Sequence, residues 1–377
     1  MKKDLVKGSA EQEKIYLIIG MLLTLLFYSV FSLKKLPLHT SSDELGAIVG
    51  AAYIAGCDWS GVISGCGYYG MGYYFLFAPL FMCTDDPLII YRVILICNGV
   101  LKTLIVWVAF RIFTDFIVIG DSRVRLLLSM LCSFMYTARI NSISNEYILE
   151  LLIWIVLFLC CKVIKNHDNI KRKNAHAFLL LLTLAYGLLI HTRWVTVIIA
   201  VIIMFGVLSI TYRKLFFPLW QVLIFAILYA IEKRIIELYQ SFVWQTGETL
   251  RNGSVTIEKG INIFDINTWK LWLDIIGGNM WAMTIFTGGF FAIAVVAVIY
   301  AVNYYVKAKE RPNIFFICIN IVMILCIGAT IVGLMVSGWF SGMFPTFAEG
   351  KTGLDVYAYK GLTYLRYWEI YVPPVAG

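Results

Sequence analysis

Residues 195–212 read VTVIIAVIIMFGVLSITY, a run without a single charged side chain. A membrane-spanning helix needs about 20 predominantly apolar residues, and runs of about 17 to 25 are long enough. The apolar residues are continuous rather than alternating, which argues against the strands of a membrane β-barrel. This stretch therefore predicts a helix that crosses a lipid bilayer.

The whole chain has the same character. Of its 377 residues, 60% are hydrophobic and only 14% are charged, and the mean hydropathy is +0.82. A soluble domain cannot bury so large an apolar fraction, so we predict an all-α polytopic membrane protein. The formal net charge of +8 could indicate binding to nucleic acid. In a membrane chain it more simply reflects Lys and Arg in cytoplasmic loops, and no nucleic-acid partner is expected.

Nine spans can be placed along the chain. They are Ile15–Leu33, Leu88–Phe110, Val124–Ile140, Tyr147–Ile164, Ala177–Ile190, Val195–Tyr212, Phe216–Tyr239, Met280–Tyr300 and Ile314–Phe340. The first run follows a lysine-rich N-terminus, and no small-x-small cleavage pattern follows it. We therefore interpret it as an uncleaved anchor rather than as a signal peptide.

A further apolar segment, Tyr68–Cys83, is short and rich in Tyr and Gly. If it does not cross, the basic residues of alternate loops lie on the same side as the basic N-terminus, as the positive-inside rule requires. These residues are Arg111, Arg123, Arg125, Lys162, Lys165, Lys171, Arg172, Lys173, Arg213, Lys214, Lys307, Lys309 and Arg311. We therefore predict that Tyr68–Cys83 is interfacial, and that the protein is a multi-pass plasma-membrane protein with a cytoplasmic N-terminus.

Under this topology three long segments face the extracytoplasmic side, near residues 34–87, 240–279 and 341–377. No internal repeat or low-complexity linker divides the chain, so residues 1–377 are predicted to form a single transmembrane domain. The last external segment ends without a polar stop, so a further span could follow in a longer parent chain.

Two neighbouring carboxylates occur early in the first external segment, in Thr40-Ser41-Ser42-Asp43-Glu44-Leu45. The spacing of Ser41 and Glu44 also fits a capping box, in which Glu44 only helps to start a helix over Leu45–Ala55. For Glu44, capping and function are equally good interpretations. A single carboxylate would suffice for the cap, so Asp43 is the stronger candidate for catalysis.

The residues downstream of this pair carry a family resemblance. A short helix is followed by a Gly-x-x-Trp break over 56–59, then by Tyr68-Tyr69-Gly70 and Ala78-Pro79-Leu80. This order resembles the first external loop of the C-type (GT-C fold) membrane glycosyltransferases. That superfamily includes the protein O-mannosyltransferases and the lipid A aminoarabinose transferases. The resemblance implies that the loop helices lie on the membrane and that Asp43 is the catalytic base, or a metal ligand as in oligosaccharyltransferase-like members.

The second external turn, Arg139–Tyr147, contains another acid. Ser144 or Asn145 could cap the following helix, with Glu146 merely in its first turn. In the resembling families an acidic residue opens the helix at this turn and faces the first-loop acid across the site. Glu146 is the residue that matches it, so the resemblance implies a role beside Asp43.

Six further residues are candidates for binding the donor and its phosphate. They are His191, Arg193, Lys233, Arg234, Arg366 and Tyr367. Arg193 is the most suggestive, because a guanidinium can bind a phosphate through two hydrogen bonds. His191 could equally be an ordinary interfacial residue, and Lys233 and Arg234 could equally extend to the headgroups. The segment 359–369, which holds the last two candidates, resembles the late external Arg-Tyr segment of the same superfamily.

The resemblance implies a glycosyltransferase that moves a hexosyl or pentosyl group from a polyprenyl-(di)phosphate donor. The acceptor would be a hydroxyl of a cell-envelope glycan, lipid or protein, and direct displacement would invert the anomeric carbon. Arg193 and Arg366 would bind the phosphate. We expect no obligatory cofactor, although Asp43, Glu44 and Glu146 could bind a divalent cation through their oxygens.

Two other functions compete with this prediction. A flippase or other transporter of lipid-linked glycans would share the basic and aromatic outer surface, but predicts polar residues deep within several spans and often a repeat. Arg92 and Lys102 are the basic residues well inside an early span. A glycan polymerase or ligase would tend to use Arg and His in a large late loop, whereas the acids of this chain come early.

The nine cysteines show no CxxC and no Cys/His spacing suited to zinc. Most lie in or beside apolar runs, where Cys behaves as a small hydrophobic residue. Cys57 and Cys66 instead bracket a Gly-rich stretch on the predicted outer side, where a disulfide could form.

Overall fold

The computed structural model describes residues 2–33, 42–57, 70–117, 121–134, 143–191, 194–243 and 313–336, together with 266, 296, 299 and 303. Within these residues the chain is almost wholly helical and contains no β-strand, which confirms the all-α class. The chain forms two compact units, Met1–Gly253 and Ser254–Gly377. The expectation of a single transmembrane domain stays a prediction.

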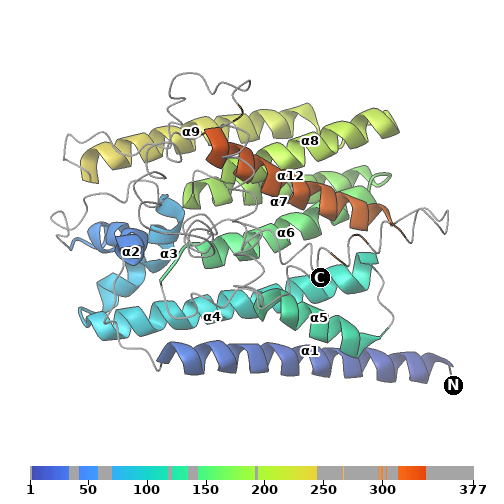
Figure 1. Cartoon of the computed structure of the whole chain (residues 1–377), viewed down its shortest axis with the longest axis horizontal. Helices are drawn as coiled ribbons and strands as arrows, with labels where there is room; N and C mark the ends of the chain where they lie inside the picture. Colours follow the sequence, from blue (N-terminus) through green and yellow to red (C-terminus); the bar gives the residue numbers. More distant parts are fainter. Residues whose placement is uncertain are drawn as a thin grey trace. The chain divides into compact units, whose positions relative to one another are not determined.

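Unit 1 holds nine α-helices and one π-helical turn within the described residues. They are α1 (Lys2–Leu33), α2 (Ser42–Ile54), α3 (Met71–Cys83), α4 (Pro87–Ile112), η2 (Phe113–Ile117), α5 (Ser122–Phe134), α6 (Glu146–Lys165), α7 (Ile170–Ile190), α8 (Val195–Tyr212) and α9 (Leu219–Val243). Unit 2 contributes α12 (Ile314–Val336). Figure 1 shows the course of these helices.

Five helical segments are long and apolar enough to cross a membrane, which makes a polytopic membrane protein the class that fits this chain. They are Glu11–Val30, Pro87–Ile117, Glu146–Lys165, Ile170–Ile190 and Val195–Tyr212. Each corresponds to one of the predicted spans, and the bounds of α8 agree with the prediction at both ends.

The other four predicted spans are not among these five candidates. Helix α5 has only 13 residues, so its described part is about 20 Å long and shorter than the hydrocarbon core of about 30 Å. Helices α9 and α12 form where spans were predicted, although neither is among the five crossing candidates. The predicted span Met280–Tyr300 lies almost wholly outside the described residues.

The interfacial segment also forms a helix, α3, with 13 residues. At about 1.5 Å per residue it is again shorter than the hydrocarbon core, and its interfacial position stays a prediction. Tyr73, Tyr74 and Phe77 are buried, and the hydroxyl of Tyr74 donates a hydrogen bond of 2.8 Å to the carbonyl of Gly46 in α2. The first external segment therefore contains a pair of short packed helices.

Local sequence explains where several helices begin. The carboxylate of Asp86 accepts hydrogen bonds from the backbone N–H groups of Leu88 and Ile89, at 2.8 and 3.3 Å, and Pro87 occupies the first position of α4. Asn169 caps α7 in the same way by accepting from the N–H of Arg172 at 3.2 Å. These side chains satisfy donors that a helix N-terminus leaves without partners.

Helix α4 is the central element of unit 1, with α1, α5 and α6 packed along it. Helix α7 packs on α6, and α3 packs on both α2 and α7. Trp154, Ile94 and Ile105 are among the large side chains buried between these helices. Helix α3 thereby connects the first external segment to the end of α7.

The contact between α3 and α7 depends on two glycines. The N–H of Gly70 donates a hydrogen bond of 2.9 Å to the carbonyl of Ile190. A Cβ atom on Gly70 would lie 1.8 Å from the carbonyl oxygen of Leu189, and one on Gly72 would lie 2.8 Å from the side chain of Ile190. Only a residue without a side chain permits this close approach of the two backbones.

We predict that Gly70→Ala destabilises unit 1, because its methyl group would force α3 away from α7. Overpacking of this kind costs about 1–3 kcal/mol. Thermal unfolding of the protein in a mild detergent measures the loss. Gly206→Ala in α8 is the matched control, because a Cβ atom there meets nothing within 4 Å. Equal melting temperatures for the two variants would contradict the proposed role of Gly70.

Candidate active site

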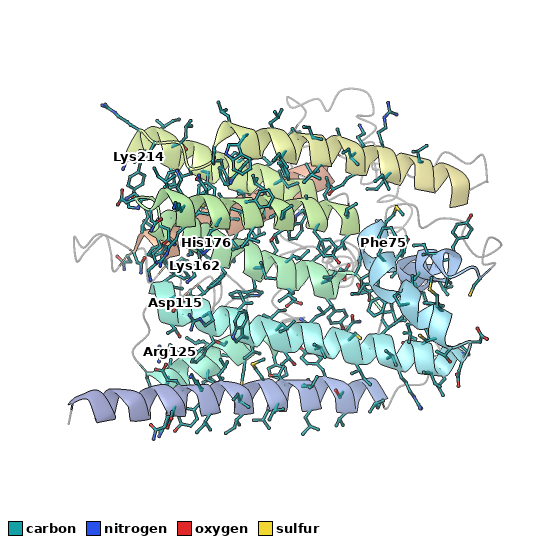
Figure 2. The ribbon with its side chains drawn as sticks, turned by 180° about the vertical axis from the view of Figure 1, so that it is seen from behind. Phe75, Asp115, Arg125, Lys162, His176 and Lys214 are labelled. Carbon is teal, nitrogen blue, oxygen red and sulfur yellow. The ribbon has the colours of Figure 1, made fainter. Side chains whose placement is uncertain are left out.

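The charged loops and the predicted site lie at opposite ends of unit 1. Figure 2 shows one group of labelled polar side chains at one end of the long helices and Phe75 of α3 at the other. The labelled polar residues are Asp115, Arg125, Lys162, His176 and Lys214. Helices α2 and α3 therefore lie away from these polar residues, and which end faces the cytoplasm stays a prediction.

Glu44 joins the first external segment to the start of α6. It stands in the first turn of α2 and only 4% of its surface is exposed. Its Oε1 atom accepts a hydrogen bond of 3.0 Å from the backbone N–H of Ile143 and one of 3.4 Å from the hydroxyl of Tyr91 in α4. The carboxylate therefore connects α2, α4 and the segment that precedes α6.

A second connection joins the start of α6 to the end of α7. The side-chain amide of Asn145 donates to the carbonyl of Ile190 at 3.3 Å. The same carbonyl accepts the N–H of Gly70, so three segments meet at one oxygen atom. Asn145 occupies the N-cap position of α6, but its side chain makes no capping hydrogen bond. The hydroxyl of Ser144, one residue earlier, accepts from the N–H of Glu146 at 3.2 Å.

Glu146 and His191 stand beside these connections. Glu146 is the first residue of α6 and is 8% exposed, so the prediction that an acid opens this helix is confirmed. His191 follows the last residue of α7, is 2% exposed, and donates its backbone N–H to the carbonyl of Gly187 at 3.1 Å. The residues next to them, Asn145 and Ile190, are hydrogen bonded to each other. Glu44, Glu146 and His191, from three separate segments, thus stand at or next to residues that these hydrogen bonds join.

Other predicted residues are placed only in part. Asp43 is in the first turn of α2, but its side chain lies outside the described residues. The residues wholly outside the described part are Ser41, Cys66, Arg193, Arg366 and Tyr367. Lys233 and Arg234 are exposed on α9, which fits either interpretation of them. Cys57 carries a free thiol.

The sequence analysis missed a buried ion pair between α4 and α6. The ammonium group of Lys102 donates to Oε2 of Glu150, and their side chains are 0% and 2% exposed. The Tyr147 ring lies 5.5 Å from the ammonium nitrogen. The signal was present in the sequence, because an ionisable residue inside a span needs a partner and Glu150 interrupts an otherwise apolar run.

The ion pair belongs to a larger buried polar group. The hydroxyl of Ser133 in α5 donates to the carbonyl of Lys102 at 2.9 Å, and the hydroxyl of Tyr28 in α1 donates to the carbonyl of Ser133 at 2.8 Å. One turn before Lys102, Asn98 accepts from the hydroxyl of Tyr73 at 3.4 Å. These contacts link α1, α3, α4 and α5 around the pair.

Burial raises the pKa of Tyr73 far above its ordinary value, because the ionised phenolate would lose its hydration. Tyr73 is therefore a neutral hydrogen-bond donor over the physiological pH range. Glu150 lies one turn beyond Glu146 on α6, so the polar group extends from the helix start into the apolar interior.

We predict that Lys102→Met destabilises the protein by about 3–5 kcal/mol, because it leaves the Glu150 carboxylate buried without its counter-charge. The double substitution Lys102→Met with Glu150→Met removes both charges and should recover most of this loss. Thermal unfolding in detergent measures both effects.

The matched control is Lys214→Met. The ammonium of Lys214 lies 3.2 Å from Asp168, and both side chains are largely exposed. Such a pair contributes at most about 1 kcal/mol. The importance of the buried pair would be refuted if Lys102→Met and Lys214→Met unfolded at the same temperature.

Comparison with known proteins does not narrow the function: no family model, curated protein or solved structure matches the chain. Among the described residues, no group of three His, Cys, Asp or Glu side chains is arranged to hold a metal ion. The functional inference therefore depends on the residues of this chain, above all on the acids at the starts of α2 and α6, which the contact between Glu44 and Ile143 joins.

Proposed function

We propose that this protein is a membrane glycosyltransferase of the C type, with about nine spans. It transfers a sugar from a polyprenyl-(di)phosphate donor to a hydroxyl of an envelope glycan, lipid or protein on the extracytoplasmic side. The proposal is based on the resemblance of residues 34–87 to the first external loop of the C-type membrane glycosyltransferases. The described geometry supports it without testing the transfer itself.

The observation that carries the proposal is the hydrogen bond of 3.0 Å between Glu44 and the N–H of Ile143. It fixes the start of α2, where Asp43 stands, close to the segment that leads into Glu146. Two acids from separate external segments are therefore available at one end of the helices. In this arrangement Glu44 is a positioning residue, because its carboxylate binds a backbone N–H and the hydroxyl of Tyr91.

The chemistry needs one base and a stabilised leaving group. The acceptor hydroxyl attacks the anomeric carbon while the bond from that carbon to the donor phosphate oxygen breaks. Asp43 takes the hydroxyl proton, and the lipid phosphate leaves with the electron pair of the broken bond. A single displacement of this kind inverts the anomeric carbon. Glu146 hydrogen bonds the acceptor and holds it toward Asp43.

The leaving phosphate requires cations. In the sequence, Arg193 comes two residues after His191, which directly follows α7, and its own placement lies outside the described residues. We propose that Arg193 binds the donor phosphate, with Arg366 and Tyr367 added from the last external segment. Lys233 and Arg234 would attract the headgroup. No step is assigned to a metal ion.

We predict that Asp43→Asn lowers transfer of a radiolabelled sugar from polyprenyl phosphate by about 100-fold or more, as expected for loss of a general base. Glu146→Gln should raise KM for the acceptor and lower kcat less. The assay uses purified protein in lipid vesicles with a panel of envelope acceptors. Asp168→Asn is the control, because Asp168 is 74% exposed at the opposite end of the bundle. Undiminished transfer by folded Asp43→Asn protein would refute the base assignment.

The sidedness has a separate test. Tyr53 in α2 is 41% exposed, and Lys171 in α7 is exposed at the other end. In a background without Cys57, Cys66 and Cys83, a membrane-impermeant maleimide should label Tyr53→Cys on intact cells. It should label Lys171→Cys only after the membrane is permeabilised. The opposite result would invert the topology and remove the active site from the outer face.

The Lys102–Glu150 pair favours a second candidate, a carrier of lipid-linked glycans. Charged groups deep in transmembrane helices commonly mark transport pathways. Oε1 of Glu150 has no hydrogen-bond partner in the described part of the chain, so it is able to accept a further donor. A carrier would move a fluorescent polyprenyl-phosphate sugar across vesicle membranes without any acceptor, and Asp43→Asn would not slow it.

A further inference from the structure

A cluster of cations surrounds one residue where α4 and α6 end. Helix α4 continues into the π-helical turn η2, which contains Asp115. The carboxylate of Asp115 lies 2.9 Å from the guanidinium of Arg111 and 3.3 Å from the ammonium of Lys162. The ammonium of Lys165 donates to the backbone carbonyl of the same residue at 3.1 Å. We call Arg111, Asp115, Lys162 and Lys165 the Asp115 cluster.

Aromatic rings hold the two lysines in place. The ammonium of Lys162 lies 5.0 Å from the centre of the Phe158 ring and 5.4 Å from that of Phe116. The ammonium of Lys165 lies 5.3 Å from the Phe116 ring. Cation–π contacts of this kind orient an ammonium group without neutralising it. The cluster is therefore built by side chains of α4, of the π-helical turn η2 that follows it, and of α6.

The cluster has more positive charge than its own acid neutralises. Arg111 and Lys162 share the single carboxylate of Asp115, and Lys165 contacts only its backbone carbonyl, so the three cations and one acid leave two positive charges. The neighbouring acids are engaged elsewhere within the described residues: Glu13 pairs with Arg125, and Asp168 pairs with Lys214 and His167. The side chain of Arg111 is 44% exposed and Lys165 is exposed. A guanidinium has five N–H donors and an ammonium has three, more than the contacts with Asp115 use.

The location of this charge indicates the ligand. Helix α4 with η2 and helix α6 are two of the membrane-crossing candidates, and the cluster stands where both end. The headgroup phosphates of a bilayer lie at this depth, and basic groups between transmembrane helices bind anionic lipid headgroups. We propose that the Asp115 cluster is a binding site for the phosphate of an anionic phospholipid, held by Arg111 and Lys165. This site is independent of the proposed transferase activity and lies at the opposite end of unit 1.

Lipid-dependent unfolding tests the site. The protein is purified in a neutral detergent, and phosphatidylglycerol, phosphatidylcholine or inorganic phosphate is added while the melting temperature is followed. Native mass spectrometry counts the lipids that remain bound. We expect phosphatidylglycerol alone to raise the melting temperature. The double substitution Arg111→Gln with Lys165→Gln should weaken this effect about tenfold in lipid concentration, as expected for the loss of charged hydrogen bonds.

Lys171→Gln with Arg172→Gln is the matched control. These two residues are exposed in the first turn of α7, at the same end, and the substitutions remove the same charge. The control should keep the response of the native protein. Lys165→Gln alone leaves the Arg111–Asp115 pair intact and replaces the double variant if that variant folds poorly. It should show a smaller but measurable loss of the response to phosphatidylglycerol.

Three results would overturn the proposal. An equal loss in the site and control variants would mean that the effect comes from general surface charge. An equal response to phosphatidylcholine would mean that the headgroup charge is irrelevant. An equal response to inorganic phosphate at the same concentration would assign the site to a free anion rather than to a lipid.

Discussion

The hydrocarbon core of a bilayer offers no water to the backbone, so each N–H and C=O group within it must find a partner in the chain. Helices satisfy this requirement everywhere except at their ends, where N–H and C=O groups are left over. In this protein several side chains and one carbonyl at helix ends satisfy these groups or join separate segments. Asp86, Ser144 and Asn169 each complete the start of a helix. The hydrogen bonds that join the candidate site also satisfy backbone groups near helix ends.

The carbonyl of Ile190 illustrates the point. It belongs to the last residue of α7, and a helix C-terminus leaves such carbonyls without intrahelical partners. Here it accepts hydrogen bonds from the N–H of Gly70 and the amide of Asn145. One unsatisfied oxygen thus orders the start of α3 and the start of α6 together. Glu146 follows Asn145 and His191 follows Ile190 in the sequence. The positions of both residues therefore follow from the hydrogen bonds that the carbonyl of Ile190 accepts.

The sequence predicted those parts of the fold that local pattern controls. The apolar run of α8 gave its bounds, and a serine before Glu146 indicated where α6 begins. Charge at alternate loops placed the basic residues at one end, and the described structure agrees. Pairings between distant residues were not predictable in this way. Lys102 and Glu150 are 48 positions apart, and their contact depends on how α4 and α6 pack.

In the candidate site too, local sequence predicted some features, and contacts between distant residues were not predictable. Glu44 was equally a cap or a catalytic residue by sequence, and only the structure shows that its carboxylate reaches the backbone N–H of Ile143 before α6. That partner is a backbone N–H, which any residue other than proline provides, so no side-chain pattern could have indicated it. The role of Asp43 stays a prediction, because its side chain lies outside the described residues.

The buried pair also bears on how an acid can stand at the start of α6. Carboxylates four residues apart on one helix face repel each other, and burial strengthens the repulsion. Glu146 and Glu150 have this spacing, but the ammonium of Lys102 neutralises the deeper one. Glu146 therefore stands beside a neutral pair rather than beside a second buried anion. A buried ion pair is weak evidence for stability in itself, because desolvation offsets much of its attraction. Its value here is that Glu150 has a counter-charge in the apolar interior, one turn below Glu146 at the start of α6.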